Sequence, residues 1–161
     1  MENKELEVKY WQLKKVVTSL VNEIRGRNWL KNMLLEELSE EKIVMFDPDL
    51  FMVDWEAKID GISLQNYMVT SYDKLLENFG KPIYGDGFKV STQWVFKSKL
   101  GQVVTLYDWK VTNLFEKSGL SVTNFRSLPY YEWHVGAHTK EAADFFITWL
   151  RIKLRDSNAN S

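Results

Sequence analysis

Hydrophobic and polar residues alternate most regularly in the segment from Phe88 to Lys97. Its apolar positions are separated by lysine, serine and glutamine, which is the two-residue period of a β-strand. The turn Lys99-Leu100-Gly101 leads into a second segment of strand character over 103–111. Because a short connection joins antiparallel neighbours, the pattern predicts an antiparallel hairpin, and we expect another strand over 131–135.

A different spacing, with apolar residues three and four positions apart, predicts helices at the amino terminus. It covers residues 2–24, and a second helix is expected from an N-cap at Asn28 to about Ser39. Together these segments predict a helical hairpin over residues 1–40. Its first helix also has the spacing of a helix–helix seam, so a homodimer through this helix is one expectation.

Two further helices are indicated by their capping residues. Ser71 is a favourable N-cap and Gly80 a favourable C-cap for a short helix between them. A closing helix is expected from Thr139 to about Leu154, because its apolar residues form one wide face. The polar residues 156–161 are expected to form a flexible tail.

Two stretches between these elements are less regular. Pro48 lies between two aspartates, which predicts a turn joining strands over 43–46 and 50–53. Residues 113–130 have no clear period and are expected to form a long loop. The sequence therefore predicts one α+β domain over residues 1–155, with an antiparallel sheet of about four to six strands over 43–155.

Composition narrows the class of protein. The chain has 161 residues with 21 basic and 22 acidic side chains, so no overall field favours nucleic acid or anionic membranes. It contains no Cys, which excludes disulfides and thiolate metal sites and favours a reducing compartment. No secretory signal or membrane span is apparent, so we expect a cytoplasmic protein.

Catalytic patterns are present only in weak form. Asp49, Glu56 and Lys58 resemble the acidic and lysine positions of metal-dependent nucleases, and Asp108 with Lys110 is a second such pair on one strand. A metal-dependent hydrolase is therefore an alternative. His134 and His138 lack an evident third ligand, so we expect no metal site. Because every catalytic pattern is weak, we also expect no cofactor and no catalytic residue, and we favour binding over enzymatic activity.

A candidate binding surface follows from the strand alternation. Lys89, Ser91 and Gln93 are expected on one face of their strand, and Tyr107 and Trp109 on one face of the next. Such a surface suits the stacking of a ring and the anchoring of a phosphate. The predicted ligand-binding residues are Lys89, Ser91, Gln93, Tyr107, Trp109 and His134.

Core packing is the alternative for the aromatic residues in this region. Tyr107, Trp109 and Trp133 would then be buried under the closing helix. Val104 and Leu106 would face the amino-terminal hairpin instead. The two interpretations differ in which face of the sheet the closing helix covers.

Four segments of the chain resemble segments of known proteins. The segments Ser71–Pro82, Gly85–Trp94, Val104–Lys110 and Glu132–Gly136 resemble small uncharacterised proteins encoded by phages and large DNA viruses, over about residues 60–150. More loosely, the order of helix, Gly-x-Pro and tryptophan-bearing strand is similar to that of β-lactamase-inhibitor-like domains. The first resemblance implies a viral accessory protein in the host cytoplasm that captures a host protein or a small nucleotide-like ligand.

Overall fold

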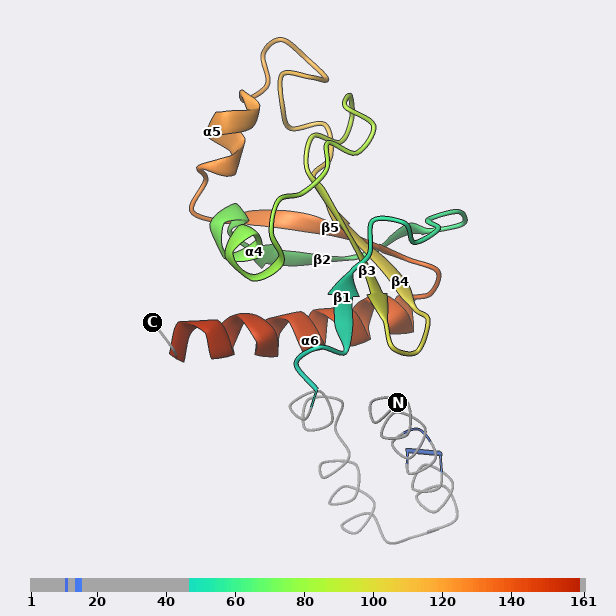
Figure 1. Cartoon of the computed structure of the whole chain (residues 1–161). Coiled ribbons are helices and arrows are strands. Elements are labelled where there is room, and N and C mark those ends of the chain that lie inside the picture. Colours follow the sequence, from blue (N-terminus) through green and yellow to red (C-terminus); the bar gives the residue numbers. More distant parts are fainter. Residues whose placement is uncertain (1–10, 12–13, 16–46, 160–161) are drawn as a thin grey trace, which may run out of the picture. The chain divides into compact units, whose positions relative to one another are not determined.

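The computed structural model describes residues 11, 14–15 and 47–159, with side chains up to Arg155 (Figure 1). The chain divides into two compact units, Met1–Pro48 and Asp49–Ser161. In the first unit, the Lys14 Nζ lies 5.1 Å from the centroid of the Trp11 ring. The rest of the predicted helical hairpin and the expected strand over 43–46 lie outside the described residues.

Five antiparallel strands form the sheet of the second unit. They lie in the order β1-β3-β4-β5-β2, so β1 and β2 are its two edges (Figure 1). The predicted hairpin is present as β3 and β4, and the expected strand after the long loop is β5. The bounds are β1 Phe51–Val53, β2 Ser63–Thr70, β3 Gln93–Ser98, β4 Val103–Tyr107 and β5 Tyr131–Ala137.

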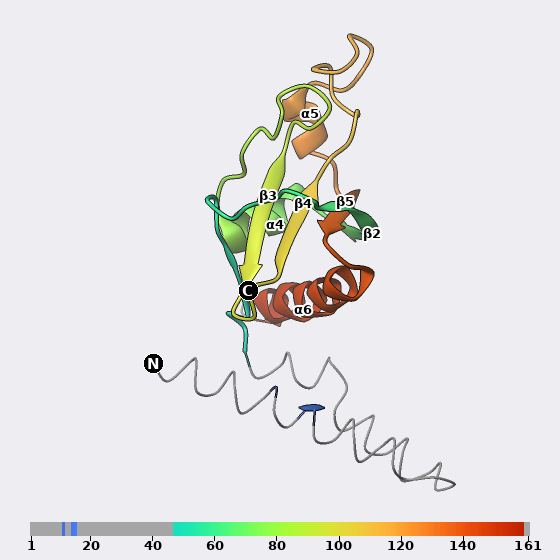
Figure 2. The same ribbon diagram turned by 90° about the vertical axis from the view of Figure 1, so that its right-hand side faces the viewer.

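Two predicted helices pack on one face of this sheet, which confirms the α+β class. The short helix α4 (Tyr72–Phe79) begins after Ser71, whose side chain accepts the Lys74 N–H, and ends at Gly80 with φ 77°. The closing helix α6 (Lys140–Ala159) lies beneath the strands (Figures 1 and 2). The Thr139 hydroxyl accepts the Ala142 N–H in its first turn.

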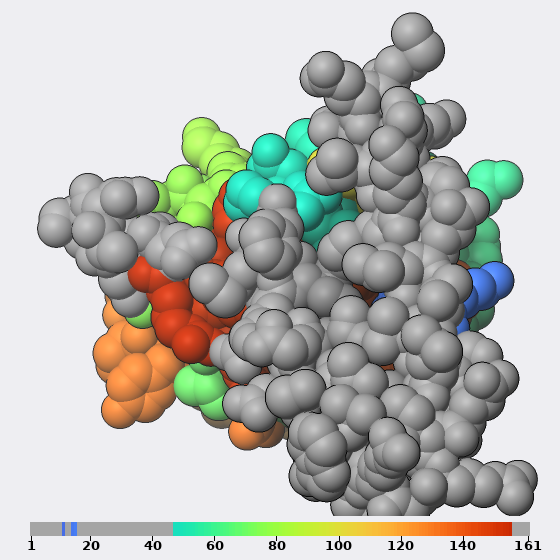
Figure 3. All heavy atoms as spheres, turned by 90° about the horizontal axis from the view of Figure 1, so that it is seen from below, coloured from blue at the N-terminus to red at the C-terminus, as the bar shows by residue number. Residues whose placement is uncertain are grey.

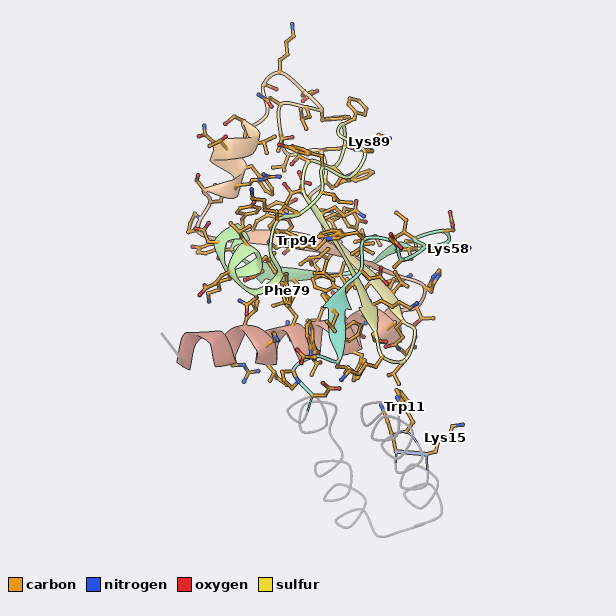
Figure 4. The ribbon with its side chains drawn as sticks, in the orientation of Figure 1. Trp11, Lys15, Lys58, Phe79, Lys89 and Trp94 are labelled. Carbon is orange, nitrogen blue, oxygen red and sulfur yellow. The ribbon has the colours of Figure 1, made fainter. Side chains whose placement is uncertain are left out.

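The core lies between the sheet and these helices. Trp94 of β3 is fully buried, and its indole N–H donates to the Gly80 carbonyl at 2.9 Å. The centroid of the Phe79 ring of α4 lies 4.9 Å from that of Phe96, and Figure 4 shows Phe79 on the side of α4 near Trp94. At the edge of the sheet, Phe51 contacts Phe146 of α6 at 5.1 Å, and Figure 3 shows the segment around β1 next to α6.

Several elements differ from the sequence-based prediction. The strand β2 was not expected, and the long loop contains a short helix, α5 (Val122–Arg126). The predicted strand over 88–97 begins only at Gln93, and the one over 103–111 ends at Tyr107. The strand β1 pairs with β3, a partner that was not predicted, while the expected pairing of residues 50–53 with 43–46 lies outside the described residues.

The closing helix covers the face that carries Trp94, Leu106 and Trp133. Leu106 pairs with Trp94 and with Val135, and all three side chains are buried. The alternative interpretation, with Tyr107 and Trp109 buried beneath the closing helix, is therefore wrong for those two residues. It is correct for Trp133, which is fully buried.

Candidate functional site

The face of the sheet opposite α6, here called the open face, carries a row of four cross-strand neighbours. The row consists of Tyr67, His134, Tyr107 and Gln93, which are paired in register across β2, β5, β4 and β3. The His134 ring lies between the two tyrosines, 5.0 Å from Tyr67 and 5.4 Å from Tyr107 between centroids. Cross-strand neighbours on one face contact each other, so the row forms a continuous surface of rings ending in an amide.

A cavity of about 180 Å³ lies on the open face beside this row. The sheet contributes Gln93, Thr105 and Tyr107 to its lining. The surrounding loops contribute Ile59, Ile62, Val90 and Trp109. The lining is therefore mostly apolar with a few polar groups, as is common for small-molecule sites.

Gly136 makes this arrangement possible. A Cβ atom at this position of β5 would lie 2.4 Å from the Thr105 hydroxyl oxygen and 2.9 Å from a methyl carbon of Ile62. Neither separation is sterically allowed. The absence of a side chain therefore lets Ile62 pack directly on the sheet, and this positions one wall of the cavity.

Trp109 stands at the rim of the cavity with 41% of its surface exposed. Its ring lies 6.3 Å from that of Tyr107. The Lys89 Nζ lies 5.7 Å and the Lys110 Nζ 5.6 Å from the centroid of the Trp109 ring. Within the described part of the chain, neither lysine forms an ion pair. Two lysine ammonium groups therefore flank one exposed ring.

Backbone contacts hold these rim residues in place. The Lys110 N–H donates to the Lys89 carbonyl at 2.7 Å, and Lys110 has φ 57°, which is unusual for a residue with a side chain. The Trp109 N–H donates to the Tyr131 hydroxyl at 3.4 Å. Lys89 lies within a turn in which the Asp86 carboxylate accepts the Phe88 and Val90 N–H groups. The rim is thus built by loops at one end of the sheet, where Figure 4 places Lys89.

The charge of Asp86 stabilises this turn. Burial alone would raise the pKa of its carboxyl group, but the N–H groups of Val90, Phe88 and Lys89, together with the Lys89 ammonium, lower the pKa below its usual value. The carboxylate form is therefore the one that the turn favours.

Ser91 does not lie on the open face. It is fully buried, and both its N–H and its hydroxyl donate to the Asp108 carboxylate, at 2.8 and 2.6 Å. The Thr92 N–H donates to the same carboxylate at 2.9 Å. Ser91 and Asp108 therefore form a buried polar cluster. The other five predicted ligand residues lie together on one side of the sheet: Lys89, Gln93, Tyr107, Trp109 and His134.

Arg126 of α5 was not singled out from the sequence, yet it closes this cluster. Its Nε donates to the Thr92 hydroxyl at 3.2 Å, and its guanidinium carbon lies 5.0 Å from the Tyr72 ring and 5.3 Å from the Tyr84 ring. An arginine held between two rings fixes the position of α5 against the loop that carries Lys89. Its place in a short helix inside an irregular segment left no signal in the sequence.

The hydrolase pattern does not assemble into a metal centre among the described residues, where no group of three or more His, Cys, Asp and Glu side chains could hold an ion. Asp108 is directed into the buried cluster, while Lys110 is exposed at the rim. Asp49 pairs with Lys153 at 3.7 Å. His138 follows His134 by four residues of extended chain, so the two residues lie about 13 Å apart.

His134 has an unusual environment for a titrating group. Its Nδ1 is buried and has no hydrogen-bond partner. Burial lowers the pKa of the imidazole below 6.5, although the negative charges of Asp108 and Glu132 oppose this effect. Since the folded state binds this proton less well than the unfolded state, the contribution of His134 to stability is lost as the pH falls from 6.5 through the folded-state pKa.

We therefore expect the ring protons of His134 to titrate below pH 6.5 in an NMR pH series. The chain contains two histidines, so a spectrum of the His138→Gln variant assigns the remaining signal. Urea denaturation between pH 5 and 7 provides the linked measurement, since His134→Gln should remove part of the loss of stability at the acidic end. An NMR pKa at or above 6.5 would contradict this description of the site.

No protein-family model matches the chain, and no curated protein sequence matches it. Within the described residues, no helix has both the length and the apolar character needed to cross a membrane. Dimerisation through the first predicted helix concerns residues outside the described part and stays a prediction.

Proposed function

We propose that this protein is a nonenzymatic binding module of the viral accessory type, which captures a small nucleotide-like ligand on the open face of its sheet. The observation that carries the proposal is the Trp109 ring at the rim of the open-face cavity, flanked by Lys89 and Lys110. A planar ring can stack on such a surface, and a phosphate can pair with the two ammonium groups.

The size of the cavity limits what can enter it. An apolar cavity of about 150 Å³ holds one benzene ring. The open-face cavity, at about 180 Å³, therefore fits one ring system of a ligand. The Gln93 amide in its lining can donate and accept hydrogen bonds at the polar edge of such a ring.

The matched test compares two exposed tryptophans. Nucleoside monophosphates are titrated into the intact protein by calorimetry, and Trp109→Ala is expected to weaken binding about 5- to 150-fold, since stacking on one aromatic side chain contributes about 1–3 kcal/mol. Trp55, with 44% of its surface exposed, does not line the cavity, and Trp55→Ala is expected to bind like the unmodified protein. Equal binding by both variants, or no binding of any nucleotide at millimolar concentration, would refute the proposal.

A host protein is the second candidate ligand, and the exposed aromatic residues near the rim favour it. Phe88 is 48% and Tyr84 60% exposed, and both lie in the loop that carries Lys89. Aromatic side chains are enriched in the centres of protein interfaces. A pull-down of a single host protein that is lost in Phe88→Ser but kept in Trp55→Ala would support this candidate over the nucleotide.

A further inference from the structure

The strand β2 forms a long, uncharged edge of the sheet. Among the described residues it pairs on one side only, with β5, and its eight residues include no charged residue and no proline. Natural edge strands are usually protected by charges, prolines or coverings, because free backbone groups pair with other chains. By contrast, the opposite edge, β1, has only three residues.

The direction of the free backbone groups follows from alternation across the sheet. Gln93 exchanges both of its backbone hydrogen bonds with Ile83, outside β3, so it does not bond to β4. In an antiparallel sheet, residues directly opposite each other alternate between pairs that exchange backbone hydrogen bonds and pairs that do not. Followed from Gln93 across β4 and β5 to β2, this alternation directs the backbone N–H and carbonyl groups of Tyr67 and Val69 away from β5. In agreement, the Tyr67 N–H donates to the Asn66 side chain at 2.8 Å. Among the residues that the structure describes, the Val69 N–H and carbonyl groups therefore have no strand partner at this edge.

A basic groove accompanies the second half of this edge. It is a cavity of about 210 Å³ at the junction of β2, α4 and α6. Its lining contains Lys74, Arg151 and Arg155 and no acidic residue. Within the described residues, Lys74 and Arg151 form no ion pair. An acidic side chain entering the groove would therefore meet Lys74 and Arg151, which have no carboxylate partner in the part of the chain that the structure describes.

We propose that the outer edge of β2 binds an extended acidic segment of a partner protein as an added strand. Met68, Val69 and Thr70 all line the groove. Alternation along β2 places the side chains of Met68 and Thr70 on the face that α6 covers and those of Tyr67 and Val69 on the open face, where both are exposed. Because side chains of an added strand alternate in the same way, its acidic residues lie toward the groove and its apolar residues lie beside Tyr67 and Val69. The partner segment has acidic and apolar residues at alternate positions.

The test uses two fluorescein-labelled peptides, one of alternating glutamate and valine and one of alternating lysine and valine, with the full chain. Fluorescence anisotropy is expected to show binding of the glutamate peptide only, weakening as salt is added. Arg151→Glu is expected to weaken binding at least about tenfold, which corresponds to the loss of one charge-assisted contact. Lys58→Glu, the same charge change at an exposed loop position outside the groove, is the matched control.

A backbone variant tests the strand pairing itself. Val69→Pro removes an N–H group that points outward and spares the bonds to β5, whereas Val69→Thr keeps this group. Proline is expected to abolish peptide binding and threonine to preserve it, with circular dichroism confirming that both variants fold. Equal binding of both peptides, or no effect of Arg151→Glu, would overturn the proposal. So would light scattering that shows a dimer dissolved by Val69→Pro, because a second copy would then occupy the edge.

Discussion

Trp94→Ala is expected to reduce the free energy of unfolding by about 3–5 kcal/mol, because it removes a large aromatic side chain from the core. The Trp94 side chain is fully buried and contacts the rings of Trp133 at 5.6 Å and Tyr72 at 5.7 Å. Truncation would leave a cavity among these rings and would also remove the hydrogen bond to the Gly80 carbonyl at the end of α4. Urea denaturation followed by circular dichroism measures the difference.

Two controls separate these contributions. Trp94→Phe keeps most of the ring volume but loses the indole N–H, so it is expected to cost less than the alanine variant. Trp55→Ala removes an indole that is 44% exposed and is expected to change stability by no more than about 0.5 kcal/mol. A loss below about 1 kcal/mol in Trp94→Ala would mean that the residue does not occupy the centre of the core.

Asp108→Ala is expected to lower the free energy of unfolding by about 3 kcal/mol or more. Two N–H groups and one hydroxyl group donate to the Asp108 carboxylate, and the side chain is fully buried. Each buried donor left without an acceptor costs about 1–3 kcal/mol. Chemical denaturation measures the loss, and nucleotide titration of the same variant shows whether the rim that follows Asp108 is displaced.

Asp108→Asn distinguishes this structural role from a catalytic one. An asparagine oxygen can still accept the two N–H groups, and its amide can donate to the Ser91 hydroxyl, so a milder loss of stability is expected. Burial raises the pKa of Asp108 while the donors from Ser91 and Thr92 oppose this rise. Mg²⁺-dependent hydrolysis of a nucleotide that disappears in Asp108→Asn, with the fold intact, would contradict the structural role and favour the hydrolase.

Elements with strong local signals could be predicted from the sequence. The helix α4 is bounded by Ser71 and Gly80, and both capping interactions are made within the segment itself. The hairpin of β3 and β4 is local as well, because a short turn joins two segments rich in apolar residues. In each case the information that determines the element lies within a few neighbouring residues.

Elements that depend on distant partners could not be predicted. The strand β2 has exposed apolar residues at Leu64 and Val69, together with a buried Thr70, so its pattern does not match a half-buried strand. Its conformation is fixed by pairing with β5. Likewise, the segment before Gln93 alternates like a strand, but the side-chain carboxylate of Asp108 accepts the N–H groups of Ser91 and Thr92 in place of a backbone carbonyl of a neighbouring strand.

In the candidate site, too, residues within one strand could be predicted from the sequence, and residues brought in from distant loops could not. Trp109 and Tyr107 were assigned to one surface from alternation along a single strand, and the structure places both at the cavity. The neighbours Ile59 and Ile62 required knowledge of how the loop before β2 folds over the sheet. Their position depends on Gly136, which is far away in the sequence, and no periodic pattern reveals such a contact.

The position of β2 at the far edge of the sheet has a consequence for folding kinetics. The bond between the Trp133 indole and the Thr70 carbonyl joins residues that are 63 positions apart, whereas β3 and β4 are connected by a short turn. Closing a long loop costs entropy before any contact is gained, so the local hairpin is expected to form early and β2 to join late. Substitutions in β2 should then change the unfolding rate more than the folding rate. The strand with the free edge would thus be the first to detach when the protein opens.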